Sequence, residues 1–324
     1  MGIESVTSAT PDSLAAELRT PPREVAATTD VLEPVEVIDY RPPFWQTLKE
    51  SWQSRHLIWD VAVTALLGYF VKYRLGPTWI VFNTFMGVIG WTLIGGGVLN
   101  VQAPNGMPYF LYTMVGIMGW QLFQSTLVIT ARSFMRLKTL IKEMYFPLIL
   151  VPIAGSSQAL LRFFLLLTTY VITVLYYWIG KGHLYAQLTP KYLFFSAAGL
   201  FLCVALAWGI SLWSAPLTAH TRDVRMLIRY VTPFLFFVTP VIYPIDRLHG
   251  NTRLIAELNP LSSPVEMAKV GLTGAGSVRT YAAIWSLVVI SLVFASGVWF
   301  MNRFGARIVG LASTGDEDDD DEFL

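Results

Sequence analysis

The fold of this chain is decided by the stretch RDVRMLIRYVTPFLFFVTPVIYP, residues 222–244. Its first part carries Arg222, Asp223, Arg225 and Arg229, its second part is apolar, and it ends in a tyrosine between two prolines. An apolar stretch of about 20 residues can cross a bilayer as a helix, and arginines gather at the cytoplasmic end of such helices. The stretch therefore predicts a membrane span with its basic end in the cytoplasm.

The composition excludes an ordinary soluble domain. Hydrophobic residues make up 54% of the 324 and charged residues only 14%, whereas soluble domains carry about 25% charged residues. Between residues 40 and 315 there are 21 lysines and arginines against seven acids, so the net charge of +1 conceals a basic core between two acidic tails. The single cysteine, Cys203, excludes an intrachain disulfide. These values indicate a polytopic membrane protein.

Long apolar runs predict an all-α fold with about six transmembrane helices. The runs lie at roughly 77–98, 109–130, 147–178, 192–213, 227–243 and 281–300. The third is too long for one straight span, and we expect it to break near Pro152 and the small residues 155–157. Sixteen lysines and arginines fall on the side of the N-terminus and six, Lys269 among them, on the opposite side. This asymmetry predicts that both termini are cytoplasmic.

The segments around the spans suggest four parts. They are a disordered cytoplasmic extension (1–40), an amphipathic interfacial segment (41–75), the six-span domain (76–308) and an acidic cytoplasmic tail (309–324). Trp45, Leu48, Trp52 and Trp59 recur near helical spacing, which is typical of a helix lying along the membrane surface. The alternative is that residues 57–71 form a seventh span, which would place the N-terminus outside.

The segment between the fifth and sixth spans, residues 245–280, is long and mixed in composition. Asn259-Pro260-Leu261 and Ser262-Ser263-Pro264 interrupt it. Non-helical backbone is tolerated at membrane depth only where protein or a cavity surrounds it. We therefore expect two short re-entrant helices on the outer side, with a simple solvated loop as the alternative.

Four motifs along the chain carry a family resemblance. They are Leu75-Gly76-Pro77-Thr78-Trp79, the run 116–123, the run 140–147 followed by Pro152, and the run 222–244 followed by Asn259-Pro260-Leu261. In this order the chain resembles the membrane subunit of an ABC-2-type exporter. It is most similar to the branch that exports polysaccharides and polyol-phosphate polymers, including O-antigen, capsule, teichoic acid and galactan. The chain departs from the family pattern at Thr64-Ala65, Thr84 and Leu148.

The resemblance implies a homodimeric permease in a bacterial plasma membrane, exporting a lipid-linked polysaccharide or similar glycopolymer. It also implies a separate nucleotide-binding ATPase partner that carries ATP and magnesium. This chain has no G-x-x-x-x-G-K-[ST] motif, so we expect it to hold no cofactor and to catalyse no reaction itself. Membrane lipids and the glycan are the other expected partners, and nucleic acid is not expected.

Two groups of residues are expected to take part in the transport cycle. The candidates for ATPase coupling are Arg132, Arg136, Lys138, Lys142, Glu143, Arg222 and Asp223. The basic residues of the loop 132–145 recur near helical spacing, which predicts a short coupling helix, although ordinary positive-inside charge is the alternative. The candidates for an outer gate region are Tyr243, Pro244, Asn259 and Pro260.

A third group holds candidates for contact with the substrate. Its members are Arg162, Trp91, Tyr112, Trp120 and Tyr177. Aromatic faces suit sugar rings, although most membrane aromatics contact lipid or pack internally. An arginine at bilayer depth is costly unless it is paired or hydrated. Arg162 therefore suggests contact with a lipid pyrophosphate or a hydrated cavity, or else hydrogen bonds to a neighbouring helix. The four histidines lack metal-ligand spacing, and no metal site is expected.

Three other functions remain open at this point. The first is an ABC-2 exporter of a drug, a peptide or a simple lipid. The second is an integral-membrane transferase, which would need convergent acids or histidines, whereas the seven acids between the tails are scattered. The third is a membrane scaffold that transports nothing.

Overall fold

The computed structural model describes residues 63, 78–136, 150–187 and 189–305, and the regular structure in these ranges is helical. The elements are α4 (Thr78–Thr92), η1 (Leu93–Val98), η2 (Pro104–Gly106), α5 (Tyr109–Thr130), α6 (Ser133–Arg136), α8 (Leu150–Gly155), α9 (Ser157–Lys181), α10 (Pro190–His220), α11 (Arg222–Val238), η3 (Ile245–Arg247), α12 (Gly250–Leu258), α13 (Ser262–Thr273), α14 (Thr280–Phe300) and η4 (Met301–Gly305). The predicted all-α class is confirmed for these ranges.

Four helical segments of the described chain are long and apolar enough to cross a membrane. They are Thr78–Val98, Ser157–Lys181, Pro190–His220 and Thr280–Gly305. Two further predicted spans coincide with α5 and α11. Helix α5 has 22 residues, but Gln121 and Gln124 lower its hydropathy. Helix α11 has only 17 residues, and its first half is charged. The structure is therefore that of a polytopic membrane protein with four clear spans.

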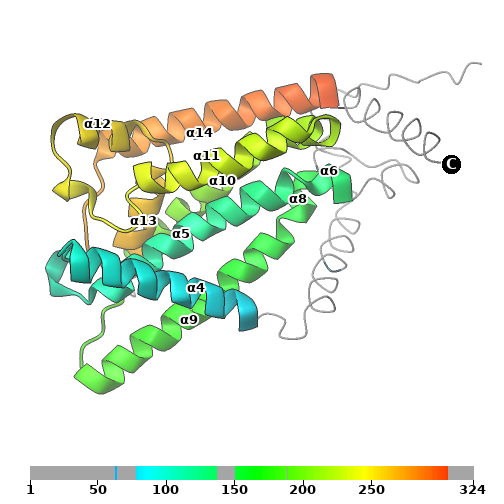
Figure 1. Cartoon of the computed structure of the whole chain (residues 1–324). Coiled ribbons are helices and arrows are strands. Elements are labelled where there is room, and N and C mark those ends of the chain that lie inside the picture. The colour runs from blue at the N-terminus through cyan, green and yellow to red at the C-terminus, as the bar shows by residue number, and fades with distance from the viewer. Residues whose placement is uncertain (1–62, 64–77, 137–149, 188, 306–324) are drawn as a thin grey trace, which may run out of the picture. The chain divides into compact units, whose positions relative to one another are not determined.

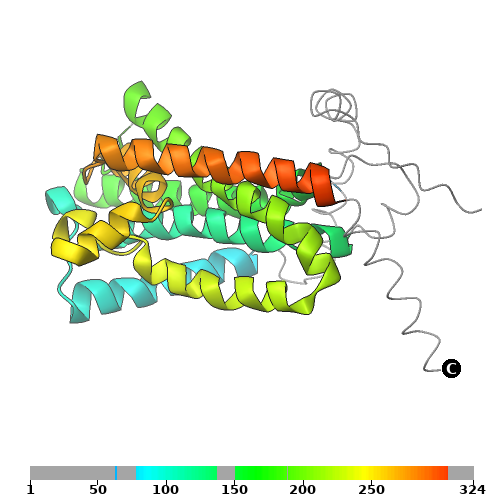
Figure 2. The same cartoon turned by 90° about the horizontal axis from the view of Figure 1, so that it is seen from above.

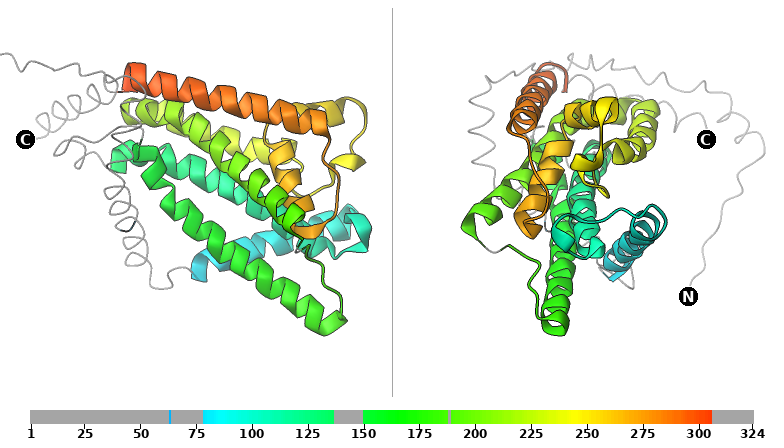
Figure 3. Two further views of the ribbon diagram at one scale, coloured as in Figure 1. Left: turned by 180° about the vertical axis from the view of Figure 1, so that it is seen from behind. Right: turned by 90° about the vertical axis from the view of Figure 1, so that its left-hand side faces the viewer.

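The long helices α4, α5, α9, α10, α11 and α14 run lengthwise past one another (Figures 1 and 2). Figure 1 places α12 and α13 at one end of this bundle and α6 and α8 at the other. The right-hand view of Figure 3 looks along the bundle from the end with α12 and α13. The chain crosses from one end to the other with each long helix, so alternate connections meet at the same end.

Helices α5 and α10 form the interior of the bundle. Helix α5 buries 16 of its 22 residues, which explains why it is apolar on every side and not on a single face. Helix α10 begins with Pro190 at its first turn, where a missing N–H costs nothing. It packs against α5, α11, α13 and α14. Most side chains of α5 are therefore surrounded by protein, whereas α10 also has exposed side chains such as Phe194 and Phe201.

The third predicted span is interrupted, as expected from its length. Helix α8 ends at Gly155 and α9 begins at Ser157. Between them, the Ser156 hydroxyl donates to the Pro152 carbonyl oxygen (3.0 Å) and accepts from the indole N–H of Trp208 on α10 (2.6 Å). The proline carbonyl and the indole thus hold the break in place.

Two short helices, α12 and α13, occupy the segment predicted to hold them. Most of α13 is buried, including Ser262, Val265 and Lys269, and it packs closely on α10. Gly199 of α10 makes this approach possible, because a Cβ there would lie 2.5 Å from the Pro264 carbonyl oxygen. A simple solvated loop is therefore excluded for the described residues of this segment.

Several predictions fall outside the described residues. They concern the extension 1–40, the interfacial segment 41–75 apart from residue 63, the loop residues Lys138, Lys142 and Glu143, and the acidic tail 309–324. These remain predictions from the sequence.

Candidate functional site

A buried lysine, Lys269 of α13, lies where three parts of the chain meet. Its side chain is 0% exposed, and that of its neighbour Glu266 only 3%. The Lys269 Nζ donates to Glu266 Oε1 (3.1 Å) and to the Tyr112 hydroxyl of α5 (3.2 Å). It also contacts the carbonyl oxygens of Pro240 and, at 3.3 Å, Tyr243. The side chain therefore joins α13 to α5 and to the segment that follows α11.

The groups that surround Lys269 can all act as partners of an ammonium. Each hydrogen-bonding partner accepts, and the ammonium also lies 4.5 Å from the centre of the Tyr112 ring. A buried charge is tolerated when it is paired and hydrogen-bonded in this way. The sequence placed Lys269 on the side opposite the N-terminus, and the structure shows that α13 carries it into the protein interior. The sequence signal for this ion pair was the spacing of Glu266 and Lys269, which are three residues apart on one helix.

The predicted outer gate residues gather around the end of α11. The Asn259 amide nitrogen donates to the Thr239 hydroxyl (2.8 Å), and its Oδ1 accepts from the backbone N–H of Leu261 (3.1 Å). The Tyr243 hydroxyl donates to the Phe237 carbonyl oxygen (2.9 Å). Pro244 and Pro260 adjoin these two residues in the sequence. The structure thus brings the group together, while its role in gating stays a prediction.

A second charged cluster lies at the same end and is more exposed. Glu257 of α12 contacts Arg253 (2.9 Å), Arg279 (3.4 Å) and the hydroxyl of Tyr281 on α14. Arg253 also contacts Asp246 (3.3 Å). Burial acts to raise the pKa of Glu257. Hydrogen bonds from Tyr281 and Arg253, together with the charges of Arg279 and Arg253, lower it by more. The pKa of Glu257 therefore lies below its ordinary value. The cluster ties α12 to the start of α14.

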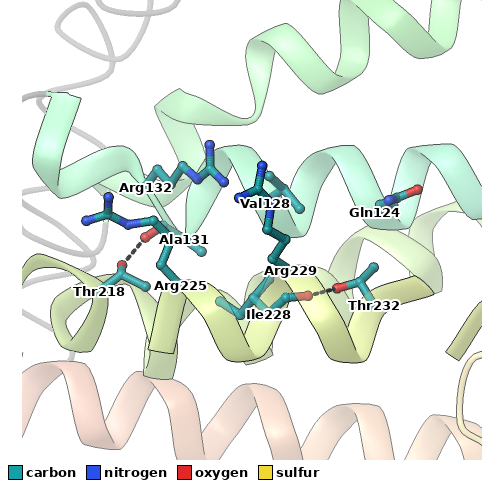
Figure 4. Close-up of a pocket in the computed structure, with 9 residues that line it drawn as sticks. All are labelled: Gln124, Val128, Ala131, Arg132, Thr218, Arg225, Ile228, Arg229 and Thr232. Atoms are coloured by element: carbon teal, nitrogen blue, oxygen red, sulfur yellow. Dashed lines mark hydrogen bonds between the residues drawn. The ribbon is translucent and has the colours of Figure 1, made fainter. Parts of the chain in front are cut away.

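The predicted coupling residues that the structure describes lie at the opposite end of the bundle. Arg136 ends α6, Arg222 begins α11, and Asp223 is exposed in the first turn of α11. Arg132 follows α5 and lines a pocket between α5 and α11 (Figure 4). The same pocket holds Arg225 and Arg229, which the sequence had placed at the cytoplasmic end of their span. Three arginines from two distant segments thus meet in one cavity.

The candidate substrate contacts do not form one group. Trp91 of α4 and Trp120 of α5 both lie against Phe236 of α11, with ring centres 5.2 and 5.4 Å apart. Tyr112 is fully buried beneath Lys269. Tyr177 and Arg162 both lie on α9, where Tyr177 contacts Tyr185 and Lys181 and Arg162 is half-buried. Of the five candidates, Trp91 and Trp120 are brought together by their contact with the same ring, which joins α4, α5 and α11.

Comparison with known proteins agrees with this arrangement. Residues 56–273, more than half of the chain, match the family model described as ABC-2 type transporter. The chain is similar to an O-antigen export system permease protein RfbA of Klebsiella pneumoniae, at 26% identity over 60% of this chain and 73% of that protein. It is also similar to an O-antigen export system permease protein RfbA of Myxococcus xanthus, at 21% identity over 67% of this chain and 80% of that protein. The chain therefore belongs to the ABC-2 type transporter family, as a membrane permease subunit that is not itself an enzyme.

Proposed function

We propose that this chain is the membrane-spanning half of an ATP-driven exporter that moves a lipid-linked polysaccharide or similar glycopolymer out of a bacterial cell. The observation that carries the proposal is the similarity to O-antigen export permeases over 60% or more of the chain. ATP is bound by a partner ATPase, because permease subunits of the ABC-2 family carry no nucleotide site. Two copies of the chain form the transport path.

The proposed topology has six spans, namely α4, α5, α9, α10, α11 and α14. Arg132, Arg225, Arg229 and Arg303 lie at the end of the bundle that carries α6. The whole sequence places sixteen lysines and arginines on the side of the N-terminus and six on the opposite side, which supports a cytoplasmic position for that end and for both termini in the plasma membrane. Helices α12 and α13 then lie at the outer end as re-entrant elements. The polar backbone of α13 is covered by protein, as membrane depth requires.

Helix α11 supplies the proposed mechanical link between the two ends. Its first turn, with Arg222 and Asp223, lies where the ATPase would act together with Arg132, Arg136 and the loop residues Lys138, Lys142 and Glu143. Its other end continues into Pro240 and Tyr243, whose carbonyl oxygens Lys269 holds. A push on the first turn would be carried along α11, past its internal Pro233, to the outer gate residues. ATP-driven closure of the ATPase subunits would thus open a path between the two copies.

Aromatic side chains are the proposed contacts for the sugar. The rings of Trp91, Trp120 and Phe236 join α4, α5 and α11, and a change in the position of α11 would move them relative to one another. Their faces suit the apolar sides of pyranose rings. Tyr112, Tyr177 and Arg162 are proposed as further contacts along a continuous channel, since a long polymer cannot be enclosed in one pocket.

The test is depletion of this protein in its own host, followed by extraction and analysis of polyprenyl-linked glycans. Accumulation of a finished or growing polymer on the cytoplasmic face would support the proposal and identify the cargo. Unchanged glycans at every stage would contradict it and favour export of a drug or simple lipid. A block at one short biosynthetic intermediate would contradict it in favour of a transferase.

A further inference from the structure

The pocket between α5 and α11 has an unusual lining. It has a volume of about 200 Å³, which is below the range of about 300–1,000 Å³ typical of drug-sized ligand sites. Arg132, Arg225 and Arg229 line it, and none of its lining residues is acidic. Figure 4 shows the three arginine side chains on the two facing helices. Its size suits a small group and its charge suits an anion.

The arginines are not neutralised within the described part of the chain. Every salt bridge found there involves Asp246, Glu257 or Glu266, all at the other end of the bundle. The Nε of Arg225 is buried without a hydrogen-bonding partner, while its Nη2 contacts the sulfur of Met135 (2.9 Å). Like charges held close together repel one another, and a buried unpaired donor costs free energy. An anion in the pocket would relieve both.

The pocket lining also contains an uncharged hydrogen-bond donor, the side-chain amide of Gln124. The indole N–H of Trp120 donates to Oε1 of Gln124 (3.0 Å), so the amide nitrogen of Gln124 remains available to a ligand. The pocket wall also contains Val128 and Ile228. A donor set made of guanidinium and amide groups beside apolar side chains suits a phosphate that carries a hydrocarbon chain.

We propose that this pocket binds the phosphate or diphosphate group of a lipid in the cytoplasmic leaflet. Arg225 and Arg229 lie one turn apart on α11, and Arg132 lies across the pocket from them, just after α5, so guanidinium groups from two segments line a cavity that can hold one anion. Two lipids could supply this group, the polyprenyl diphosphate carrier of the cargo or an anionic phospholipid. The carrier as the source rests on the proposed function, whereas the anion site does not.

The site would also connect lipid binding to the proposed movement. Arg225 and Arg229 belong to the helix whose first turn is proposed to face the ATPase, while Gln124 belongs to the buried helix α5 and Arg132 follows its end. An anion bound to both would hold α11 against α5. Loss of the anion would leave the repulsion between the guanidinium groups uncompensated at this contact.

The test uses the full-length protein assembled with its ATPase partner in phosphatidylcholine nanodiscs. Binding of added polyprenyl diphosphate, and separately of phosphatidylglycerol, is measured by native mass spectrometry over a range of lipid concentrations. The variants are Arg229→Gln and Arg225→Gln. The matched control is Arg303→Gln, an exposed arginine near the same end of the bundle and outside the pocket. Assembly of each variant with the ATPase is measured in parallel by size-exclusion chromatography.

We expect each pocket variant to weaken polyprenyl diphosphate binding by about tenfold, the effect of losing one charge-assisted hydrogen bond, and the control to bind as the wild type does. A loss confined to polyprenyl diphosphate would identify the carrier as the source. An equal loss for phosphatidylglycerol would support the phosphate site with a phospholipid as its ligand. Unchanged binding of both lipids would overturn the proposal. If ATPase assembly weakened instead, the arginines would be contacts for acidic protein groups.

The outcome is separable from that of the depletion experiment. Unchanged glycans in the depleted host together with arginine-dependent diphosphate binding would contradict the glycopolymer cargo and leave the anion site standing. Accumulated polymer together with unchanged lipid binding in the variants would support the glycopolymer cargo and overturn the anion site.

Discussion

Replacement of Lys269 by methionine is expected to weaken the attachment of α13 to the bundle. Methionine keeps an unbranched side chain of similar reach but removes the ammonium. Glu266 then remains as a carboxylate of which only 3% is exposed, and the Tyr112 hydroxyl and the Pro240 carbonyl oxygen lose the donor that Lys269 supplied. The variant therefore leaves a buried charge without its partner.

The magnitude follows from the burial of both partners. Removal of one member of a buried ion pair typically costs about 3–5 kcal/mol, mainly because the other charge is left uncompensated. Lys269 and Glu266 lie at 0% and 3% exposure, so little solvent reaches the remaining carboxylate. The double variant Glu266→Gln with Lys269→Met removes that charge. It is expected to recover a large part of the loss.

The assay is thermal and denaturant-induced unfolding of the purified protein in one detergent, followed by tryptophan fluorescence. Lys191→Met is the matched control, because Lys191 is exposed at the start of α10, and surface substitutions usually change stability by less than about 0.5 kcal/mol. We expect Lys269→Met to be the least stable of the three variants. Equal stability of Lys269→Met and Lys191→Met, or a double variant less stable than the single one, would refute the reasoning.

Three further predictions concern other parts of the molecule. Gly199→Ala should destabilise the protein by about 1–3 kcal/mol through overpacking against α13, whereas Gly90→Ala, with open space around its Cβ, should not; equal unfolding midpoints would contradict this. Because the pKa of Glu257 is depressed in the folded protein, its stabilising effect is present above its ordinary pKa of about 4.3 and is lost as pH falls through the lower folded value. Below about pH 4 the wild type should therefore lose its advantage over Glu257→Gln in thermal unfolding, and a constant difference from pH 7 to pH 3 would argue against the cluster. Asp223→Asn, at the exposed start of α11, should leave assembly with the ATPase intact and lower transport per ATP hydrolysed; an unchanged ratio would remove Asp223 from the coupling surface.

Much of the fold followed from properties that are local in the chain. Apolar runs of sufficient length located α4, α9, α10 and α14, and the excess length of one run predicted its break beside Ser156. Prolines and small residues between residues 245 and 280 predicted two short helices there, now seen as α12 and α13. Helix α11 is less clear by these criteria, because its charged first half shortens the apolar run.

The site was predicted less completely, because its contacts join distant positions. The motif residues Tyr243 and Asn259 were singled out, and both lie around the end of α11. Arg225 and Arg229 were predicted to lie on the cytoplasmic side, but their shared pocket with Arg132 was not predicted, since nothing local indicates that α11 lies beside the end of α5. The contact of Trp91 and Trp120 with the Phe236 ring of α11 was not predicted either, because these residues come from segments that are far apart in the sequence.

The amino-acid sequence by itself determined that the chain is a membrane protein of the ABC-2 family with long apolar helices. Helix length, hydropathy and the order of motifs are properties of neighbouring residues, so they can be read along the chain. Only the tertiary structure decided that Lys269 is buried against Tyr112, 157 positions earlier, and that Arg132 shares a pocket with Arg229. The position of a charge in the interior or at the surface depends on which helices pack around it, and that packing brings together residues with no local relation.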